Sequence, residues 1–367
     1  MTIVRHRFHA LCPYFAMFPE NFAETWIERL TRPGDLVLDP FCGRGTTPFQ
    51  ALLMGRHALA GDINPVAFCV TKAKTNAPPL PALLRRLTFL ENRFEPSHWE
   101  GERRRLPEFF RWAYCPSTLR QVLFMRATLN WIGSKTDCMI AALILGSLHG
   151  ETEKSPSFLS SQMPHTISTK PLYSIRFWKE RSLRPPDRDV FELLRQRAHF
   201  RYASPLPDGE AMVYHDDFRE LPRRAQKLVG RPRCVITSPP YFDVTNAEED
   251  QWLRLWFLGG PPFPTATDKS GDCRHGSLTG FWDLISDIWR SLSRVMDNKA
   301  DVVIRLGGKN LEPEELVRGL QATSVFGRRK VELLHHEVSA LKNRQTNSFR
   351  PGSKGLAFEV DCHFRMS

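Results

Sequence analysis

A glycine-rich turn between two apolar segments is the first feature of this sequence that could bind a ligand. Residues 39–47 read Asp-Pro-Phe-Cys-Gly-Arg-Gly-Thr-Thr, and Gly43 and Gly45 leave the backbone open to close approach. The turn lacks the last glycine of a dinucleotide fingerprint, because that position is Pro48, and it lacks the Gly-Lys-Ser/Thr of a phosphate loop. Asp62 ends the next apolar segment, where a carboxylate can bind ribose hydroxyls. These residues predict a nucleotide-type ligand.

A second feature, Ser238-Pro239-Pro240-Tyr241, follows the apolar segment Val235-Ile236-Thr237. The prolines fix the backbone φ angle and remove two N–H donors, so carbonyl acceptors remain at the tip. The exocyclic amine of a nucleobase is conjugated with its ring and is a poor nucleophile. Acceptors at Ser238 and at the Pro239 carbonyl would take its two hydrogens and free the nitrogen lone pair, while Tyr241 stacks on the base. Such a segment alone is more typical of a proline-rich turn, but together with the glycine turn it favours chemistry on an amine.

The elements around these motifs follow an α/β pattern. Residues 36–38 are typical of a buried strand, a helix is expected from Thr46 to Met54, and residues 58–62 form a second strand. This β-α-β unit predicts a parallel sheet covered by helices on both faces. Further elements are expected as strands at residues 212–214, 234–236 and 302–304, a helix at residues 281–296, and an antiparallel strand at residues 357–364.

A long insert interrupts this sheet. At 367 residues the chain is long for one domain. The insert is marked by a proline-rich break at residues 78–81, an arginine-rich helical stretch at residues 83–124, a polar and irregular stretch at residues 155–186, and a linker at residues 205–208. We therefore expect three parts: residues 1–75 and 209–367, which form one sheet, and residues 76–208, a largely helical insert.

Both motifs resemble those of the amino-methylating DNA methyltransferases, which use S-adenosylmethionine to modify N4 of cytosine or N6 of adenine. Residues 39–47 are similar to the family's methyl-donor motif, Asp-Pro-Phe-x-Gly-x-Gly-Thr-Thr, and residues 238–241 are similar to its catalytic motif, Ser/Asp/Asn-Pro-Pro-aromatic. The resemblance covers residues 8–75 and 210–310. It implies an α/β fold with a Rossmann-like class I methyltransferase sheet, mostly parallel with an antiparallel last strand, in which the insert is the target-recognition region.

The resemblance also implies roles for individual residues. The catalytic residues would be Ser238, Pro239, Pro240 and Tyr241. The donor would be bound by Phe15, Phe18 and Pro19 before the first strand, by Asp39, Pro40, Phe41, Gly43, Gly45, Thr46 and Thr47 in the glycine turn, by Asp62 at the ribose and Ile63 at the adenine, and by Asp217 at the adenine amine with Phe218. The motif with Asp217 follows the insert, which departs from the family's usual grouping. Residues 248–256 would form a helix that lines the site.

The implied reaction is direct methyl transfer to the amine of a base flipped out of double-stranded DNA, with no metal and no covalent enzyme intermediate. Serine at position 238 favours N4 of cytosine, because the family's Ser-Pro-Pro enzymes are mostly of that kind; N6 of adenine is the alternative. Two further alternatives are an RNA enzyme, similar to the tRNA guanine methyltransferases, and a DNA-binding protein without activity. A cognate restriction endonuclease is a further candidate partner, and no oligomeric state is predicted.

The charge of the chain agrees with a polyanionic partner. Lysine and arginine number 51 against 40 aspartate and glutamate residues, which gives a net charge of +11. The candidates for phosphate or base contacts are Arg103, Arg104, Arg105, Arg111, Arg181, Arg184, Arg344 and Arg350. For any one of them, a solvated surface is at least as good an interpretation.

Metal sites, disulfides and membrane segments are not expected. The eight cysteines are scattered, without a Cys-x-x-Cys pair or a histidine cluster at ligand spacing. No apolar run approaches the length of about 18 residues that is typical of a membrane span, and the N-terminal residues do not resemble a signal peptide. We therefore expect a cytoplasmic protein.

Overall fold

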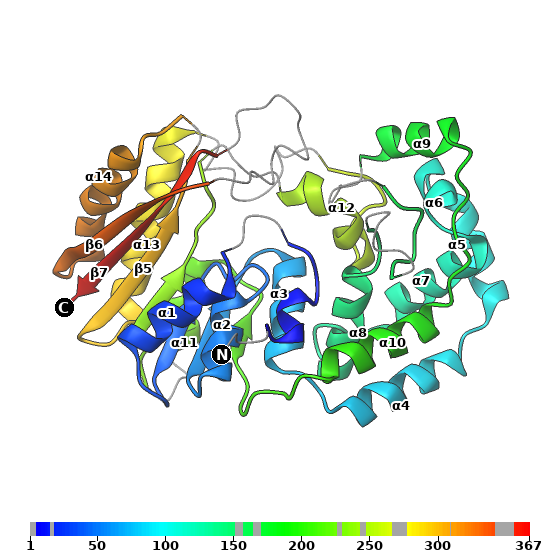
Figure 1. Ribbon diagram of the computed structural model, residues 1–367, viewed down its shortest axis with the longest axis horizontal. Helices are drawn as coiled ribbons and strands as arrows, with labels where there is room; N and C mark the ends of the chain where they lie inside the picture. The colour runs from blue at the N-terminus through cyan, green and yellow to red at the C-terminus, as the bar shows by residue number, and fades with distance from the viewer. Residues whose placement is uncertain are drawn as a thin grey trace. The chain divides into compact units, whose positions relative to one another are not determined.

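The computed structural model describes residues 5–14, 18–150, 157–163, 170–225, 230–242, 247–265, 277–308, 310–341 and 356–367. The chain divides into two compact units, and Figure 1 labels helices of both units and some of the strands. The sheet unit comprises Tyr14–Thr71, Pro207–Asn246 and Asp268–Ser367. The helical unit comprises Met1–Pro13, Lys72–Leu206 and Ala247–Thr267.

The sheet unit is built on a seven-stranded sheet with the strand order β3-β2-β1-β4-β5-β7-β6. Its parallel strands are β1 (Leu36–Asp39), β2 (His57–Gly61), β3 (Met212–Tyr214), β4 (Cys234–Thr237) and β5 (Ala300–Leu306). The last strand, β7 (Phe358–Met366), runs antiparallel to both β5 and β6 (Val331–Ala340). All predicted strands are present, and the predicted α/β fold, a mostly parallel sheet with an antiparallel last strand, is confirmed.

Side chains of the central strands alternate between the two faces of the sheet, as the two-residue period of a strand requires. Leu36 and Leu38 of β1 pack in one hydrophobic cluster with Val302, whereas Val37 packs in another cluster with Ile236. Both clusters are buried, so the strands are apolar on both faces. This is why the sequence shows continuous apolar runs at these positions.

Helices cover both faces. α1 (Glu20–Leu30) and α2 (Thr46–Leu53) contribute Trp26 and Leu52 to the cluster that contains Val37. The other face carries α11 (Leu221–Ala225), α13 (Leu278–Val295) and α14 (Pro313–Ser324), with the short helices η4 (Phe218–Glu220) and η7 (Val325–Gly327). The predicted helices over residues 46–54 and 281–296 are therefore confirmed.

Strand β6 was not predicted from the sequence. Most of its side chains are exposed, including those of His335 and His336, so it lacks the apolar pattern of the inner strands. It pairs with β7 from Val331 to Ala340, with a register shift between Leu333 and His335. Pairing with a buried neighbour, which the local sequence does not encode, holds this strand in place.

The helical unit confirms the predicted helical insert. Its elements are η1 (Arg7–Ala10), α4 (Leu80–Glu91), η2 (Pro96–Trp99), α5 (Glu100–Arg105), α6 (Glu108–Ala113), α7 (Pro116–Thr128), α8 (Lys135–Leu145), α9 (Pro171–Glu180), α10 (Val190–Tyr202) and α12 (Ala247–Phe257). Helix α3 (Pro65–Thr75) contains the division between the two units. Helix α9 lies in the stretch that was expected to be irregular; it begins at Pro171, a residue type favoured in the first turn of a helix.

Helix α12, which follows the catalytic motif in sequence, belongs to the helical unit because two tryptophans anchor it there. The ring of Trp256 lies 4.5 Å from that of Phe110, and the ring of Trp252 lies 5.0 Å from that of Phe109. Arg126 Nε donates to the Trp256 carbonyl at 2.8 Å. The compact units therefore differ from the predicted sequence limits mainly in residues 1–13 and 247–267, and by a few residues at each end of the insert.

Candidate active site

The predicted donor and catalytic motifs lie at one edge of the sheet. β3, β2, β1 and β4 are neighbours in the sheet, and Asp217, Asp62, Asp39 and Ser238 end these strands or follow them within a few residues. Because parallel strands have their carboxyl ends at the same edge, the four motifs meet there. The fold thus brings together segments that the insert separates in sequence.

The glycine turn takes a conformation that requires glycine. Gly43 and Gly45 have φ angles of +49° and +70°, in the left-handed region. A Cβ atom at Gly45 would lie 2.5 Å from Oγ1 of Thr71. That hydroxyl donates to the Gly43 carbonyl at 3.0 Å. Gly45 is also the N-cap of α2, so the N–H groups of Thr46 and Thr47, which have no acceptor within the helix, lie at this turn.

Asp62 is bonded to the glycine turn. Its Oδ2 accepts from the Gly43 N–H and its Oδ1 from the Asn64 N–H, each at 2.9 Å. Burial raises the pKa of Asp62 to about 6, and the two N–H donors oppose that rise. Each carboxylate oxygen keeps a second lone pair, so the half-buried group can still accept from ribose hydroxyls. Beside it, the Ile63 side chain is 55% exposed and offers an apolar surface.

Asp39 is buried and connects the glycine turn to β4, the strand that precedes Ser238. Its Oδ1 accepts from the Thr237 hydroxyl at 2.7 Å and from the Phe41 N–H at 3.2 Å. Burial raises the pKa of Asp39 to about 7, against the effect of these hydrogen bonds. The Thr47 hydroxyl donates to the Ile236 carbonyl at 3.0 Å, which is a second link between the turn and β4. Asp39 and Thr47, like the buried Pro40 and Thr46, therefore hold the turn in shape.

The motif after β3 separates into a polar and a core residue. Asp217 accepts from the Arg219 N–H at 2.9 Å and pairs with its guanidinium at 2.6 Å. Phe218 is 5% exposed and packs on Phe41, with ring centroids 4.9 Å apart. His215 Nε2 lies 3.1 Å from the Ile63 carbonyl and so connects the ends of β3 and β2. Phe218 is therefore a core residue in the structure.

The motif before β1 is described only in part. Phe15 lies outside the described residues, Phe18 is buried against Phe22, and the exposed Pro19 is the N-cap of α1. An unpredicted ion pair links this segment to the glycine turn, because Arg44 Nη2 lies 3.3 Å from Glu20 Oε1. A charged residue at a variable position of the donor motif was the only signal for this pair in the sequence.

The catalytic motif leaves the end of β4, but its tyrosine is not open to a base. Tyr241 is 5% exposed and belongs to the hydrophobic cluster that contains Leu36 and Val302. Its hydroxyl lies 3.2 Å from Ser238 Oγ and 2.8 Å from Glu359 Oε1. The expectation that its ring stacks on a base is therefore not met in this structure, because packing and hydrogen bonds hold the side chain in the core.

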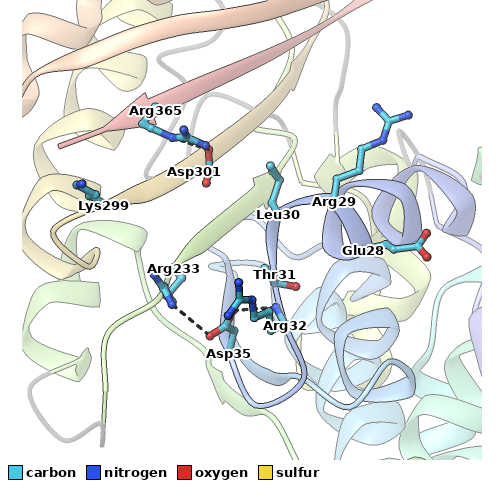
Figure 2. Close-up of a pocket in the computed structure, with 10 residues that line it drawn as sticks. All are labelled: Glu28, Arg29, Leu30, Thr31, Arg32, Asp35, Arg233, Lys299, Asp301 and Arg365. Atoms are coloured by element: carbon cyan, nitrogen blue, oxygen red, sulfur yellow. Dashed lines mark hydrogen bonds and ion pairs between the residues drawn. The ribbon is translucent and has the colours of Figure 1, made fainter.

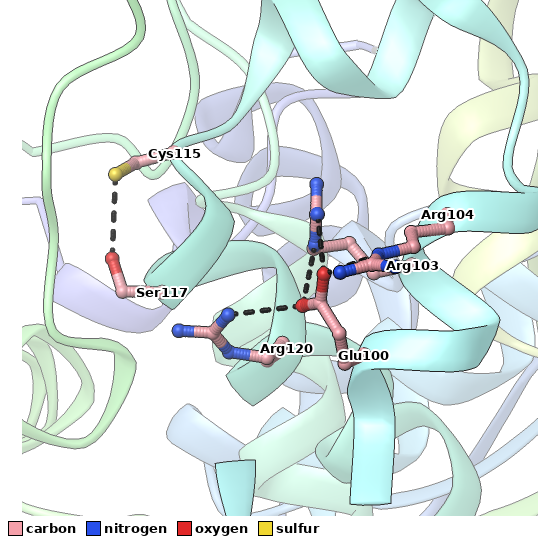
Figure 3. A network of polar contacts seen from close by, with 6 residues as sticks. All are labelled: Glu100, Arg103, Arg104, Cys115, Ser117 and Arg120. Atoms are coloured by element: carbon pink, nitrogen blue, oxygen red, sulfur yellow. Dashed lines mark hydrogen bonds and ion pairs between the residues drawn. The ribbon is translucent and has the colours of Figure 1, made fainter. Parts of the chain in front are cut away.

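The basic residues predicted to contact nucleic acid differ in their exposure and in their bonding within the protein. Arg103 and Arg104 bind Glu100, which also accepts from Arg120, as Figure 3 shows. The Arg103 side chain is 17% exposed, so most of its bonding capacity is used within the helical unit. The exposed candidates are Arg104, Arg105, Arg111, Arg181 and Arg184. Arg344 and Arg350 lie outside the described residues.

A charged pocket occurs at the opposite edge of the sheet (Figure 2). Asp35 and Arg233, which line it, directly precede β1 and β4, and Asp301 is the second residue of β5. The donor and catalytic motifs follow the other ends of β1 and β4. This pocket is therefore separate from the candidate active site.

Within the described residues, no group of three or more histidine, cysteine, aspartate and glutamate side chains is arranged to hold a metal. No helix in this part of the chain has the length and apolarity to cross a membrane.

Comparisons with known proteins agree with the donor motif. Residues 5–72 match the family model for DNA methylases. A 66-residue segment is 33% identical to the Type II methyltransferase M.MjaII of Methanocaldococcus jannaschii, which is 18% of this chain and 12% of that protein. The resemblance to the amino-methylating DNA methyltransferases is thus confirmed, over the N-terminal part of the chain.

Solved structures of methyltransferases align with the chain only weakly. The rRNA methyltransferase aviRa from Streptomyces viridochromogenes has a TM-score of 0.35 and 13% identity, with 99% of this chain and 94% of that chain covered. TrmN from Thermus thermophilus has a TM-score of 0.37 and 11% identity, with 99% and 52% covered. Similarity at this level says nothing about the substrate of this chain.

The site residues fit S-adenosylmethionine, the methyl donor of the matched family. The shape of the glycine turn requires glycine, because a Cβ atom at Gly45 would lie 2.5 Å from Thr71 Oγ1, and the turn leads directly into the N-terminus of α2. Asp62 has acceptor capacity for two ribose hydroxyls, and Ile63 presents an exposed apolar side chain next to it. Gly43, Asp62 and Ile63 are the residues that would hold the donor.

Proposed function

We propose that this protein is a DNA methyltransferase that transfers the methyl group of S-adenosylmethionine to the exocyclic amine of a flipped base, with N4 of cytosine as the target. The observation that carries the proposal is the hydrogen bond from Thr237 to Asp39, because it joins the strand of the Ser-Pro-Pro-Tyr motif to the glycine turn of the donor site. The DNA methylase match over residues 5–72 supports the same reaction class.

The chemistry needs positioning more than acid or base strength. The donor supplies a methyl group on a positively charged sulfur. The amine nitrogen forms a bond to the methyl carbon with its lone pair, the carbon–sulfur bond breaks with its electrons going to sulfur, and one amine proton passes to water. Ser238 Oγ and the Pro239 carbonyl accept the two amine hydrogens and bring the nitrogen lone pair into line with the methyl group. Pro240 keeps this tip rigid, since its φ angle is fixed.

Double-stranded DNA is the proposed partner, and the exposed arginines of the helical unit support it. The Arg181 guanidinium lies 4.0 Å from the centre of the Phe177 ring, and Arg176 lies over Tyr173 at 5.9 Å. Tyr173 is 50% exposed. Aromatic rings that support exposed arginines in this way present cations to phosphates with little loss of side-chain freedom. We further propose a cytoplasmic enzyme, with a cognate restriction endonuclease as a second partner.

Product analysis tests the reaction. Unmethylated, PCR-amplified duplex DNA and, in a parallel reaction, tRNA are each incubated with the protein and labelled S-adenosylmethionine, digested to nucleosides and analysed by mass spectrometry. The expected product is N4-methylcytosine, which Ser238→Ala should abolish while Ser97→Ala, at an exposed serine of η2, should not. N6-methyladenine would move the target to adenine, label in tRNA alone would overturn the substrate class, and label in neither would favour a binding protein without activity.

Salt dependence tests the partner. Replacing Arg181 with Gln should weaken DNA binding, and should reduce the slope of log K against log salt by about one unit, as expected for one lost phosphate contact. Arg103→Gln is the matched control, because the Arg103 side chain is bonded to Glu100 and only 17% exposed, whereas that of Arg181, which also lies near a glutamate, is 51% exposed. Equal slopes for Arg181→Gln and wild type would remove Arg181 from the interface.

A further inference from the structure

We infer that Glu359 is a positioning residue that, through Tyr241, turns the Ser238 hydroxyl into a hydrogen-bond acceptor for the target amine. This role rests on the proposed function. This role assigns a function to Tyr241, whose ring is buried and not open to a base. It also adds a residue of β7 to the candidate active site.

A chain of polar contacts runs from the catalytic serine to strands β5 and β7. Ser238 Oγ lies 3.2 Å from the Tyr241 hydroxyl, which lies 2.8 Å from Glu359 Oε1. The other carboxylate oxygen of Glu359 lies 3.4 Å from Arg305 Nη1. Arg305 in turn binds both oxygens of Asp361, each at 2.6 Å. The chain therefore ends in a buried cation that is fixed by a second acid.

The chemistry of these groups determines which of them donates in each hydrogen bond. An ionised carboxylate can only accept hydrogen bonds, so the Tyr241 O–H must donate to Glu359. Burial, with the charge of Glu359 second, raises the pKa of Tyr241 well above its usual range, so this proton stays on the hydroxyl at neutral pH. Tyr241 then has no further hydrogen to give, and Ser238 must be the donor in their contact. Both lone pairs of Ser238 Oγ remain available to the amine.

Packing prevents the tyrosine from leaving this arrangement. A Cβ atom at Gly307 would lie 2.9 Å from Tyr241 Cδ2, so the ring occupies the space left by the missing side chain. The Phe242 N–H donates to the Gly307 carbonyl at 3.3 Å and ties the motif to the end of β5. The side chains of Glu359 and Arg305 are 17% and 10% exposed, which keeps competing water largely away from their contact.

The orientation of the hydroxyl proton matters for a serine at position 238, whereas an aspartate there would have no such proton to orient. A carboxylate at position 238 is an acceptor by its nature, whereas a hydroxyl carries a proton of its own that can point at the amine and oppose its hydrogens. The chain to Glu359 commits that proton to Tyr241. Loss of the Tyr241 hydroxyl should therefore lower activity when position 238 is a serine and much less when it is an aspartate. A merely structural role of Tyr241 would give the same loss with both residues.

The test compares Tyr241→Phe in two backgrounds, wild type and Ser238→Asp, with methyl transfer to the same unmethylated DNA as the assay. With serine at position 238, loss of the tyrosine hydroxyl should lower kcat about 10- to 100-fold, as expected when one hydrogen bond to a charged group is lost. The dissociation constant of S-adenosylmethionine should stay within about twofold, because donor residues are untouched. With aspartate there, the same change should cost less than about threefold, because no hydroxyl proton has to be oriented. Equal losses in both backgrounds, or no loss in the first, would overturn the inference.

A second pair of variants keeps the inference testable if Ser238→Asp is inactive. Glu359→Gln keeps an oxygen that accepts from Tyr241 and should retain most of kcat, whereas Glu359→Leu should show the loss seen for Tyr241→Phe. Glu337→Leu, at an exposed acid of β6, is the control and should leave kcat unchanged. Equal kcat for the Gln and Leu variants would overturn the role of Glu359. Wild-type protein that gives no methylated DNA overturns the proposed function itself, and the role of Glu359 with it.

Discussion

Asp39→Asn is expected to gain stability over the wild type as the pH rises. Asp39 is 1% exposed, and burial raises its pKa from 3.8 to about 7. A carboxyl group with a raised pKa stays protonated in the folded protein at pH values where it is ionised in the unfolded chain. Its contribution to the free energy of unfolding is therefore complete below about pH 4 and is lost as the pH rises to about 7.

The expected size follows from the two pKa values. Each pH unit between them costs the wild type about 1.4 kcal/mol, so the loss from about pH 5 to about pH 7 is about 2–3 kcal/mol. Asparagine has no proton to lose, and its Oδ1 can still accept from the Thr237 hydroxyl and the Phe41 N–H. The stability of the variant minus that of the wild type should rise by this amount and level off above about pH 8.

Urea denaturation across this pH range measures the difference directly. Groups that titrate alike in both proteins cancel in the subtraction. Asp208→Asn, at an exposed aspartate, is the control, and its difference from wild type should stay flat. A constant difference for Asp39→Asn from about pH 5 to about pH 8 would refute the reasoning, because it would mean that the buried carboxyl group is ionised throughout.

Three further predictions concern the donor site and the helical unit. Gly45→Ala should lower the free energy of unfolding, measured by urea denaturation, by about 2–5 kcal/mol, because alanine strains the left-handed backbone and clashes with Thr71. Adding Thr71→Ala should restore only part of this loss, and full restoration would mean that the backbone is not strained. Asp62→Asn should weaken S-adenosylmethionine binding about 10- to 100-fold by calorimetry, since a charged acceptor is lost, and unchanged affinity would remove Asp62 from the donor site. Trp256→Ala should lower the free energy of unfolding in urea by about 3–5 kcal/mol, because the buried Trp256 ring packs on Phe110. A loss under about 1 kcal/mol would contradict the anchoring of α12 by this tryptophan.

Much of the sheet unit could be predicted from local sequence. Buried parallel strands are continuous apolar runs, so β1, β2, β4 and β5 were visible as such. The donor turn was visible because Gly43 and Gly45 take backbone angles that other residues avoid. Strand β6 was not visible, because its side chains are mostly exposed and only its pairing with β7 makes it a strand.

The sequence by itself determined the two motifs on which the proposed chemistry rests, since the segments around Gly43 and Ser238 carry their acceptors and their backbone shape within a few residues. The tertiary structure decided how those motifs are supported. Tyr241 meets Glu359 across 118 positions of the chain, and α12 joins the insert through Phe110. The physical reason is that burial and hydrogen-bond pairing depend on which distant segments fold together, and no local spacing records that choice.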